Sequence, residues 1–113
     1  MAIRDQTLKA FPFLFEEFGF AFLDTAAPDS DLVVIAESGL IRLRFIQDRA
    51  DFFLHVGSSK TPEKWIDLYD LLQEMKGKGL ISEGYKYANR IAAVSRILRK
   101  TFHTLQAYML SKN

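Results

Sequence analysis

The sequence predicts a single α+β domain in which helices pack on one face of an antiparallel β-sheet. Its 113 residues match the usual size of one domain, and 49% hydrophobic with 26% charged residues is typical of a folded globular chain. Hydrophobic residues recur every three or four positions near both ends and every second position in the middle. For residues 1–113 we therefore expect an N-terminal helix, a four-stranded antiparallel β-meander and two C-terminal helices.

The first element is expected to be a helix over roughly residues 5–18. Its hydrophobic residues are spaced by three and four positions and form a stripe: Leu8, Phe11, Phe15 and Phe18. Pro12 lies inside this range. Because proline lacks a backbone N–H and crowds the preceding turn, the helix either kinks at Pro12 or begins there.

Four strands are expected next, joined by residues that favour turns. The composition of residues 27–31 predicts a loop, Ser38-Gly39 fits a two-residue hairpin turn, and residues 48–51 fit a four-residue turn. The strands themselves are predicted at about residues 20–25, 32–37, 40–47 and 52–57.

These turns fix which residues lie opposite one another. In the first hairpin Ala36 should face Ile41, and Val34 should face Leu43. In the second, Leu43 should face Val56, and Phe45 should face Leu54. Both pairings put the same nonpolar set on one face, which we call the core face: Leu32, Val34, Ala36, Ile41, Leu43, Phe45, Phe52, Leu54 and Val56.

Two helices are expected after the sheet. Thr61 as N-cap and Pro62 at the first helical position predict a helix that ends at Gly77. A second helix is expected from about Gly84 to Leu110. At 1.5 Å per residue this helix would be about 40 Å long, longer than such a domain is wide, so it protrudes, kinks or packs against a second copy. Its hydrophobic positions include Tyr87, Ile91, Val94, Leu98, Leu105 and Tyr108.

The sequence contains no recognisable catalytic, cofactor or metal site. There is no cysteine, which excludes disulfides and thiolate chemistry and fits the reducing cytoplasm. Gly77-Lys78-Gly79 lacks the spacing of a phosphate-binding loop. The uncharged run of residues 10–15 is too short for a signal peptide or a membrane span. We therefore expect a cytoplasmic protein that is not an enzyme, has no cofactor and does not bind membranes.

The opposite side of the sheet, which we call the outer face, is about half nonpolar. A solvent-exposed face is usually mostly polar, so either the first helix or an extended segment covers this one, or it binds a partner. Arg44 should lie opposite His55 and diagonal to Phe53, within reach of an arginine–aromatic contact. The outer face consists of Val33, Ile35, Arg42, Arg44, Ile46, Phe53 and His55.

Charge is distributed unevenly along the chain. Residues 1–83 carry nine Lys and Arg against 14 Asp and Glu, whereas residues 84–113 carry six Lys and Arg and no acid. The acidic and basic residues are expected to form stripes of opposite charge on consecutive helices. These stripes either attract each other or a second chain, or the basic stripe binds the phosphates of a nucleic acid. The acidic stripe is Glu63, Asp67, Asp70 and Glu74; the basic stripe is Arg96, Arg99, Lys100 and His103.

Three segments carry a family resemblance: residues 37–49 (ESGLIRLRFIQDR), residues 53–57 (FLHVG) and residues 65–68 (WIDL). Together they resemble a set of small bacterial proteins of unassigned function, some of which are similar to immunity proteins that neutralise toxins. The resemblance implies a bacterial origin and a compact α+β domain, and it carries no catalytic residue.

The leading hypothesis is a non-enzymatic, immunity-like protein-binding module that acts through the outer face, the long last helix, or both. A homodimer fits this hypothesis, because the hydrophobic spacing of the last helix is close to 3.5 residues. The second hypothesis is a small nucleic-acid-associated protein that uses the basic stripe. The third is an enzyme with an unrecognised site.

Overall fold

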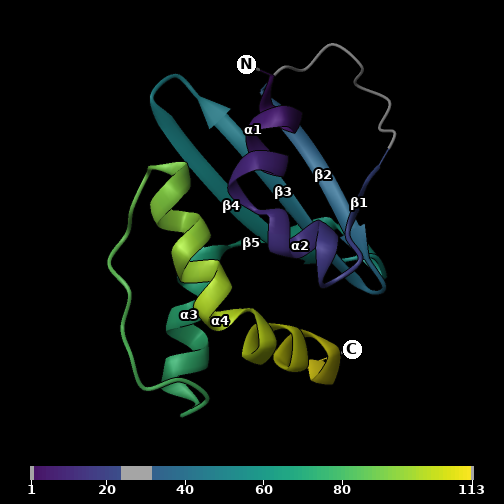
Figure 1. The fold of residues 1–113 in the computed structure, drawn as a ribbon. Helices are drawn as coiled ribbons and strands as arrows, with labels where there is room; N and C mark the ends of the chain where they lie inside the picture. Colours follow the sequence, from purple (N-terminus) through teal and green to yellow (C-terminus); the bar gives the residue numbers. More distant parts are fainter. Residues whose placement is uncertain (1, 24–31, 113) are drawn as a thin grey trace.

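A computed structural model describes residues 2–23 and 32–112 and shows an α+β fold with helices at both ends of the chain (Figure 1). The predicted fold class is confirmed, but the antiparallel sheet has five strands, in the order β1-β2-β3-β4-β5. Residues 24 and 25 of the first expected strand and the expected loop at residues 27–31 lie outside the described residues. The elements are α1 (Ile3–Ala10), α2 (Pro12–Glu16), β1 (Ala21–Phe22), β2 (Val33–Ser38), β3 (Ile41–Asp48), β4 (Asp51–Ser58), β5 (Thr61–Asp67), α3 (Leu68–Gly77) and α4 (Ile91–Lys112).

The register between β3 and β4 is the predicted one, with Leu43 opposite Val56. Between β2 and β3 the pairing is shifted by two residues, so that Ala36 faces Leu43. The turn there is Gly39-Leu40, and Gly39 takes a φ of +59° that glycine adopts at little cost. Because a shift of two preserves the side-chain alternation, seven predicted members of the core face are buried and Val34 is partly buried against them. Leu32 is the exception: it precedes β2 and is 55% exposed, so its predicted place in the core was wrong.

The predicted first helix is two helices, separated at Phe11. Pro12 begins the second one, where its missing N–H costs no hydrogen bond. The amide of Phe11 still donates to the carbonyl of Thr7, so α1 closes before the chain turns. The Phe11 ring is fully buried, and its centroid lies 5.2 Å from that of Phe45 on the core face.

The helix predicted to begin at Thr61 is wrong over its first seven residues, which form the edge strand β5. Trp65 lies opposite Gly57 of β4, and because glycine has no side chain the indole ring can lie over it. An edge strand tolerates the proline at position 62. Asp67 is the actual N-cap of α3: its Oδ1 accepts the amide of Tyr69 at 2.8 Å.

This correction also divides the predicted acidic stripe. Glu63 and Asp67 lie on β5, whereas Asp70 and Glu74 lie on α3, so the four carboxylates do not share one helix face. The end of α3 at Gly77 is confirmed. The residues that α3 buries are Leu68, Leu71, Leu72 and Met75.

The last helix begins at Ile91 and not near Gly84. The connection that precedes it is held in an extended form by Asn89. The amide of Phe52 donates to the Asn89 carbonyl, and the Asn89 side chain donates to Asp51 at 2.6 Å. Tyr69 donates its hydroxyl to the carbonyl of Ala88. These hydrogen bonds use the carbonyl groups of Ala88 and Asn89, which in a continuous helix would accept from amides of the same helix.

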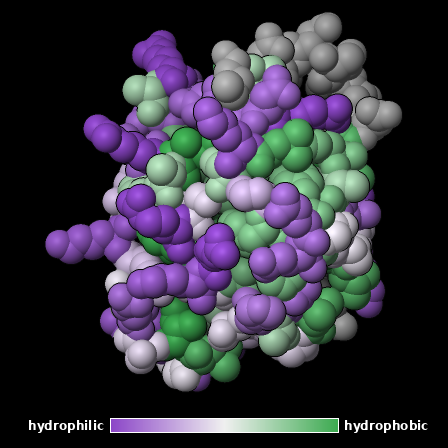
Figure 2. Space-filling view, viewed as in Figure 1, coloured by the Kyte–Doolittle hydropathy of each residue, from purple (hydrophilic) through white to green (hydrophobic). Residues whose placement is uncertain are grey.

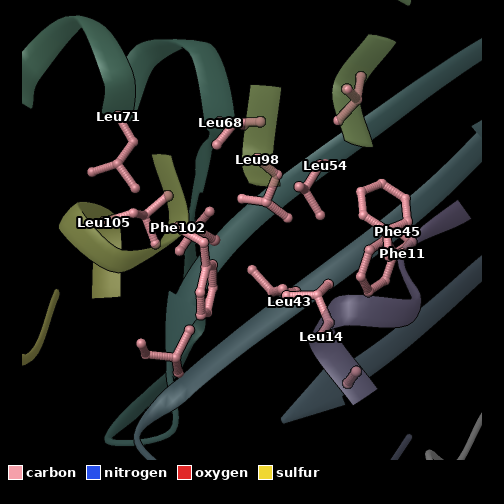
Figure 3. Packing of buried hydrophobic residues seen from close by; sticks show 14 of the residues in the cluster. Phe11, Leu14, Leu43, Phe45, Leu54, Leu68, Leu71, Leu98, Phe102 and Leu105 are labelled. Carbon is pink, nitrogen blue, oxygen red and sulfur yellow. The ribbon is translucent and has the colours of Figure 1, made fainter. Parts of the chain in front are cut away.

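The 22 residues of α4 bend midway across the core (Figure 1). In the middle of the helix, Thr101 donates its hydroxyl to the carbonyl of Ile97 at 2.9 Å, a bond that commonly curves helices. Leu98, Phe102 and Leu105 point into the same nonpolar cluster as Leu43 (Figure 3). Leu105 is fully buried. Four residues of the predicted hydrophobic stripe are thus buried within the chain: Val94, Leu98, Leu105 and Tyr108. Ile91 is only partly buried, and Tyr87 precedes the helix and is exposed.

A hydrogen bond joins the first and last helices. Ser95 of α4 donates its hydroxyl to the carbonyl of Ala10, the last residue of α1, at 2.5 Å. Below this bond the Phe18 ring lies edge-on to Phe102, with centroids 4.5 Å apart. The helices thus form one layer over the core face.

Candidate functional site: the outer face of the sheet

The structure brings the seven predicted outer-face residues together on one side of the sheet. Six of them form two rows across the strands, Arg42 lies in a third row between Glu37 and Gly57, and each of the seven side chains is half-buried. The first row is Val33, Ile46 and Phe53, on β2, β3 and β4; the second is Ile35, Arg44 and His55 on the same three strands.

The first helix does not cover this face. Both α1 and α2 contribute buried side chains to the opposite side, where Phe11 contacts Phe45 and Phe52. The helices of the described chain lie within residues 3–16, 68–77 and 91–112, and all of them pack toward the core face. The outer face therefore has no helical cover among the residues that the structure describes.

The middle of the face is an assembly of three side chains. The guanidinium carbon of Arg44 lies 4.5 Å from the centroid of the Trp65 ring, a cation–π contact. On its other side, the guanidinium reaches His55 Nδ1, at 2.7 Å from Nη2 and 3.2 Å from Nε. Trp65 lies in the range that was predicted as a helix, so sequence reasoning missed it here. The signal that points to it is Gly57, since glycine inside a strand often marks a close approach.

The assembly favours the neutral form of His55. Burial lowers the pKa of His55, and the positive charge of Arg44 lowers it further, while Asp67 acts in the opposite direction. Because Arg44 has only donors, Nδ1 of His55 must accept and cannot carry a proton in this arrangement. Burial also lowers the pKa of Arg44, but a guanidinium remains charged at any physiological pH.

The two arginines of β3 differ in their partners. Arg42 donates from Nε to Glu37 at 2.6 Å, so a carboxylate of the neighbouring strand neutralises it. Arg44 forms no ion pair with a described residue. Asp67, which lies opposite His55 on β5, uses Oδ1 to cap α3. Arg44 thus presents an uncompensated positive charge on a half-nonpolar surface, held in place by an aromatic ring.

Within residues 2–23 and 32–112, no group of three or more His, Asp or Glu side chains could hold a metal ion. Four serine hydroxyls of the described residues take part in hydrogen bonds: Ser38 donates to the Phe18 carbonyl, Ser95 to the Ala10 carbonyl and Ser111 to the Tyr108 carbonyl, and Ser58 accepts the Lys60 amide.

The basic stripe lies on α4 as predicted, but it is not a uniform row of free cations. The Arg99 guanidinium lies 5.8 Å from the Phe13 ring, and the His103 ring lies 5.1 Å from that of Phe18. Half of the stripe therefore packs against the N-terminal aromatic segment. All four residues of the stripe are nevertheless exposed, and Arg96 lies at a groove described below.

No helix in the part of the chain that the structure describes is both long and nonpolar enough to cross a membrane. Comparison of the chain with protein-family models, with curated proteins and with solved structures found no match in any of the three.

Proposed function

We propose that this protein is a non-enzymatic protein-binding module whose partner docks on the outer face of the sheet. One observation carries the proposal: Arg44, stacked on Trp65, lies in the middle of a half-nonpolar face that no described helix covers. Trp and Arg are the residue types that most often dominate the binding energy of protein interfaces. Partly exposed charged groups that are already paired within the protein, such as Arg42 with Glu37, contribute less.

The energetics of the face favour an interface. Its nonpolar residues Val33, Ile35, Ile46 and Phe53 are only half-buried, so each retains part of the roughly 1.5–3 kcal/mol that full burial of such a side chain contributes. Arg44 is already held by His55 and Trp65. A partner that binds it therefore immobilises less side-chain freedom than it would with a free arginine.

A different protein fits this face better than a second copy does. The central strand of the sheet, β3, presents both Arg42 and Arg44, and a two-fold axis near that strand would bring like charges together. Within this proposal the protein is a bacterial, cytoplasmic and immunity-like module, and its partner is a toxin. The resemblance in residues 37–68 supports this form of the proposal.

Site-specific photocrosslinking tests the proposal in cells that express the protein. A benzophenone amino acid at Phe53 probes the outer face, and the same group at Lys100 is the control on α4. We expect one discrete heteromeric adduct from position 53 and none from position 100. Arg44→Gln should remove most of this adduct, whereas Arg42→Gln, on the same strand and face, should leave it largely intact.

Three outcomes would contradict the proposal. Equal adducts from both positions would mean that the outer face is not a specific site, and no adduct from position 53 would remove its support. An adduct of twice the chain's mass would identify the partner as a second copy. Sedimentation of the unmodified protein at about 100 micromolar checks that last outcome independently, because a homodimer would sediment as one.

The nucleic-acid hypothesis ranks second, because two of the four exposed residues of the basic stripe, Arg99 and His103, contact phenylalanine rings. We expect no submicromolar complex with DNA or RNA at physiological salt. If such a complex formed, its affinity would fall steeply with salt, and Ala at Arg96, Arg99 and Lys100 would flatten that slope.

A further inference from the structure

A groove of about 510 Å³ lies between α1 and the first turns of α4, on the helix side of the molecule and away from the outer face. On this side Figure 2 shows hydrophobic surface between hydrophilic side chains. The groove is lined by Gln6, Lys9, Ala10, Ile91, Ala92, Ser95 and Arg96.

The floor of the groove is mainly hydrocarbon. Ala10 ends α1, and Ile91 and Ala92 begin α4, so three nonpolar side chains meet where the two helices approach. Ser95 adds little polarity, because its hydroxyl donates to the carbonyl of Ala10. A nonpolar chain lying here would cover Ile91, which is only partly buried.

The rim of the groove is positively charged from both sides. Lys9 stands on α1 and Arg96 on α4, and both are exposed. Neither forms an ion pair with a described residue, since the two ion pairs of residues 2–23 and 32–112 involve other side chains. The groove also lies at the N-terminal end of α4, whose first turn contains no acid. Partial positive charge at a helix N-terminus favours an anion there.

We propose that this groove binds a single amphiphilic anion, a hydrocarbon chain that ends in a carboxylate. The chain lies on Ala10, Ile91 and Ala92, and the carboxylate lies between Lys9 and Arg96. Small-molecule sites commonly have this composition, with volumes of about 300–1,000 Å³, mostly nonpolar walls and a few polar groups that orient the ligand. The inference does not depend on the proposed function, because the two sites share no residue.

Titration with sodium decanoate below its micellar concentration tests this inference on the whole chain. We expect saturable, one-to-one binding, with amide NMR shifts concentrated in α1 and the first turns of α4. Decanol should bind more weakly, and decyltrimethylammonium more weakly still. Lys9→Gln and Arg96→Gln should each raise the dissociation constant roughly fivefold, as expected for a partly exposed ion pair. Lys100→Gln, an exposed cation outside the groove, should leave it unchanged.

Filling the groove gives a second test that does not depend on charge. Ala92 is exposed on α4, so Ala92→Phe should leave the fold intact and block the hydrocarbon chain. Three results would overturn the inference: decanol binding as tightly as decanoate, decanoate binding that Ala92→Phe does not affect, or binding to anionic phospholipid vesicles without binding to monomeric decanoate. The last result would mean that the basic rim recognises a membrane surface.

Discussion

Replacing Leu43 with Ala should lower the free energy of unfolding by about 2.5–5 kcal/mol. Leu43 is fully buried in the middle of β3, between Ala36 on β2 and Val56 on β4 (Figure 3). The substitution removes three carbons, which at about 0.8 kcal/mol each amounts to roughly 2.4 kcal/mol of lost transfer free energy. Ala36 is too small to fill the space, so the cavity adds to this cost.

Arg42 is the matched control, because it is the preceding residue on the same strand and points to the outer face. Its ion pair with Glu37 is partly exposed, with 24% and 28% of the two side chains accessible. Such pairs contribute less than about 1 kcal/mol, so Arg42→Ala should have a small effect.

Urea denaturation of the two variants measures the difference. If the slope with urea stays constant, Leu43→Ala should lower the midpoint several times more than Arg42→Ala does. An Arg42→Ala midpoint that fell as far as that of Leu43→Ala, or further, would mean that the two faces of the sheet are exchanged.

Two further predictions concern the same strands. Gly57→Ala should lower the free energy of unfolding by about 1–3 kcal/mol, because the new Cβ would lie 2.8 Å from a backbone carbonyl oxygen of β5. The control is Gly77→Ala, whose Cβ would meet nothing within 4 Å. Equal stability of the two variants in urea would refute the close approach of β4 and β5. Burial and Arg44 lower the pKa of His55 in the folded protein. Between the folded pKa and the unfolded value of about 6.5, the unfolded chain therefore binds more protons than the folded one. The free energy of unfolding should decrease as the pH falls through this range and then level off. In an NMR titration Arg44→Gln should raise the pKa of His55 and Arg42→Gln should not, and a wild-type His55 that titrated above 6.5 would contradict this account.

The sheet could be predicted because its strands and turns are determined by residues close together in the sequence. Alternating hydrophobic residues assign each strand's faces, and short turns between β2, β3 and β4 leave few registers that keep those faces consistent. The exact turn mattered less: pairing Ala36 with Leu43, and not with Ile41, changed no residue's side of the sheet. All seven predicted outer-face residues therefore lie together in the structure.

The fifth strand could not be predicted, because the cause lies elsewhere in the chain. Thr61 followed by Pro62 has the pattern of a helix start, and helix propensity is judged from neighbours in sequence. What makes these residues a strand is the free edge of β4 and the space above Gly57 that accepts Trp65. For the same reason, the sequence did not reveal Trp65 as the partner of Arg44, since Trp65 belongs to a segment that was interpreted as a helix.

The bond between Ser95 and Ala10 joins residues 85 positions apart in the sequence. During synthesis at about 5–20 residues per second, Ser95 is added roughly 4–17 s after Ala10. Through that interval the first phenylalanines, including Phe18, lack the α4 ring of Phe102 that packs against them in the finished fold. The nascent chain therefore exposes aromatic surface until its last helix is made, which is the period in which chaperone binding or aggregation competes with folding.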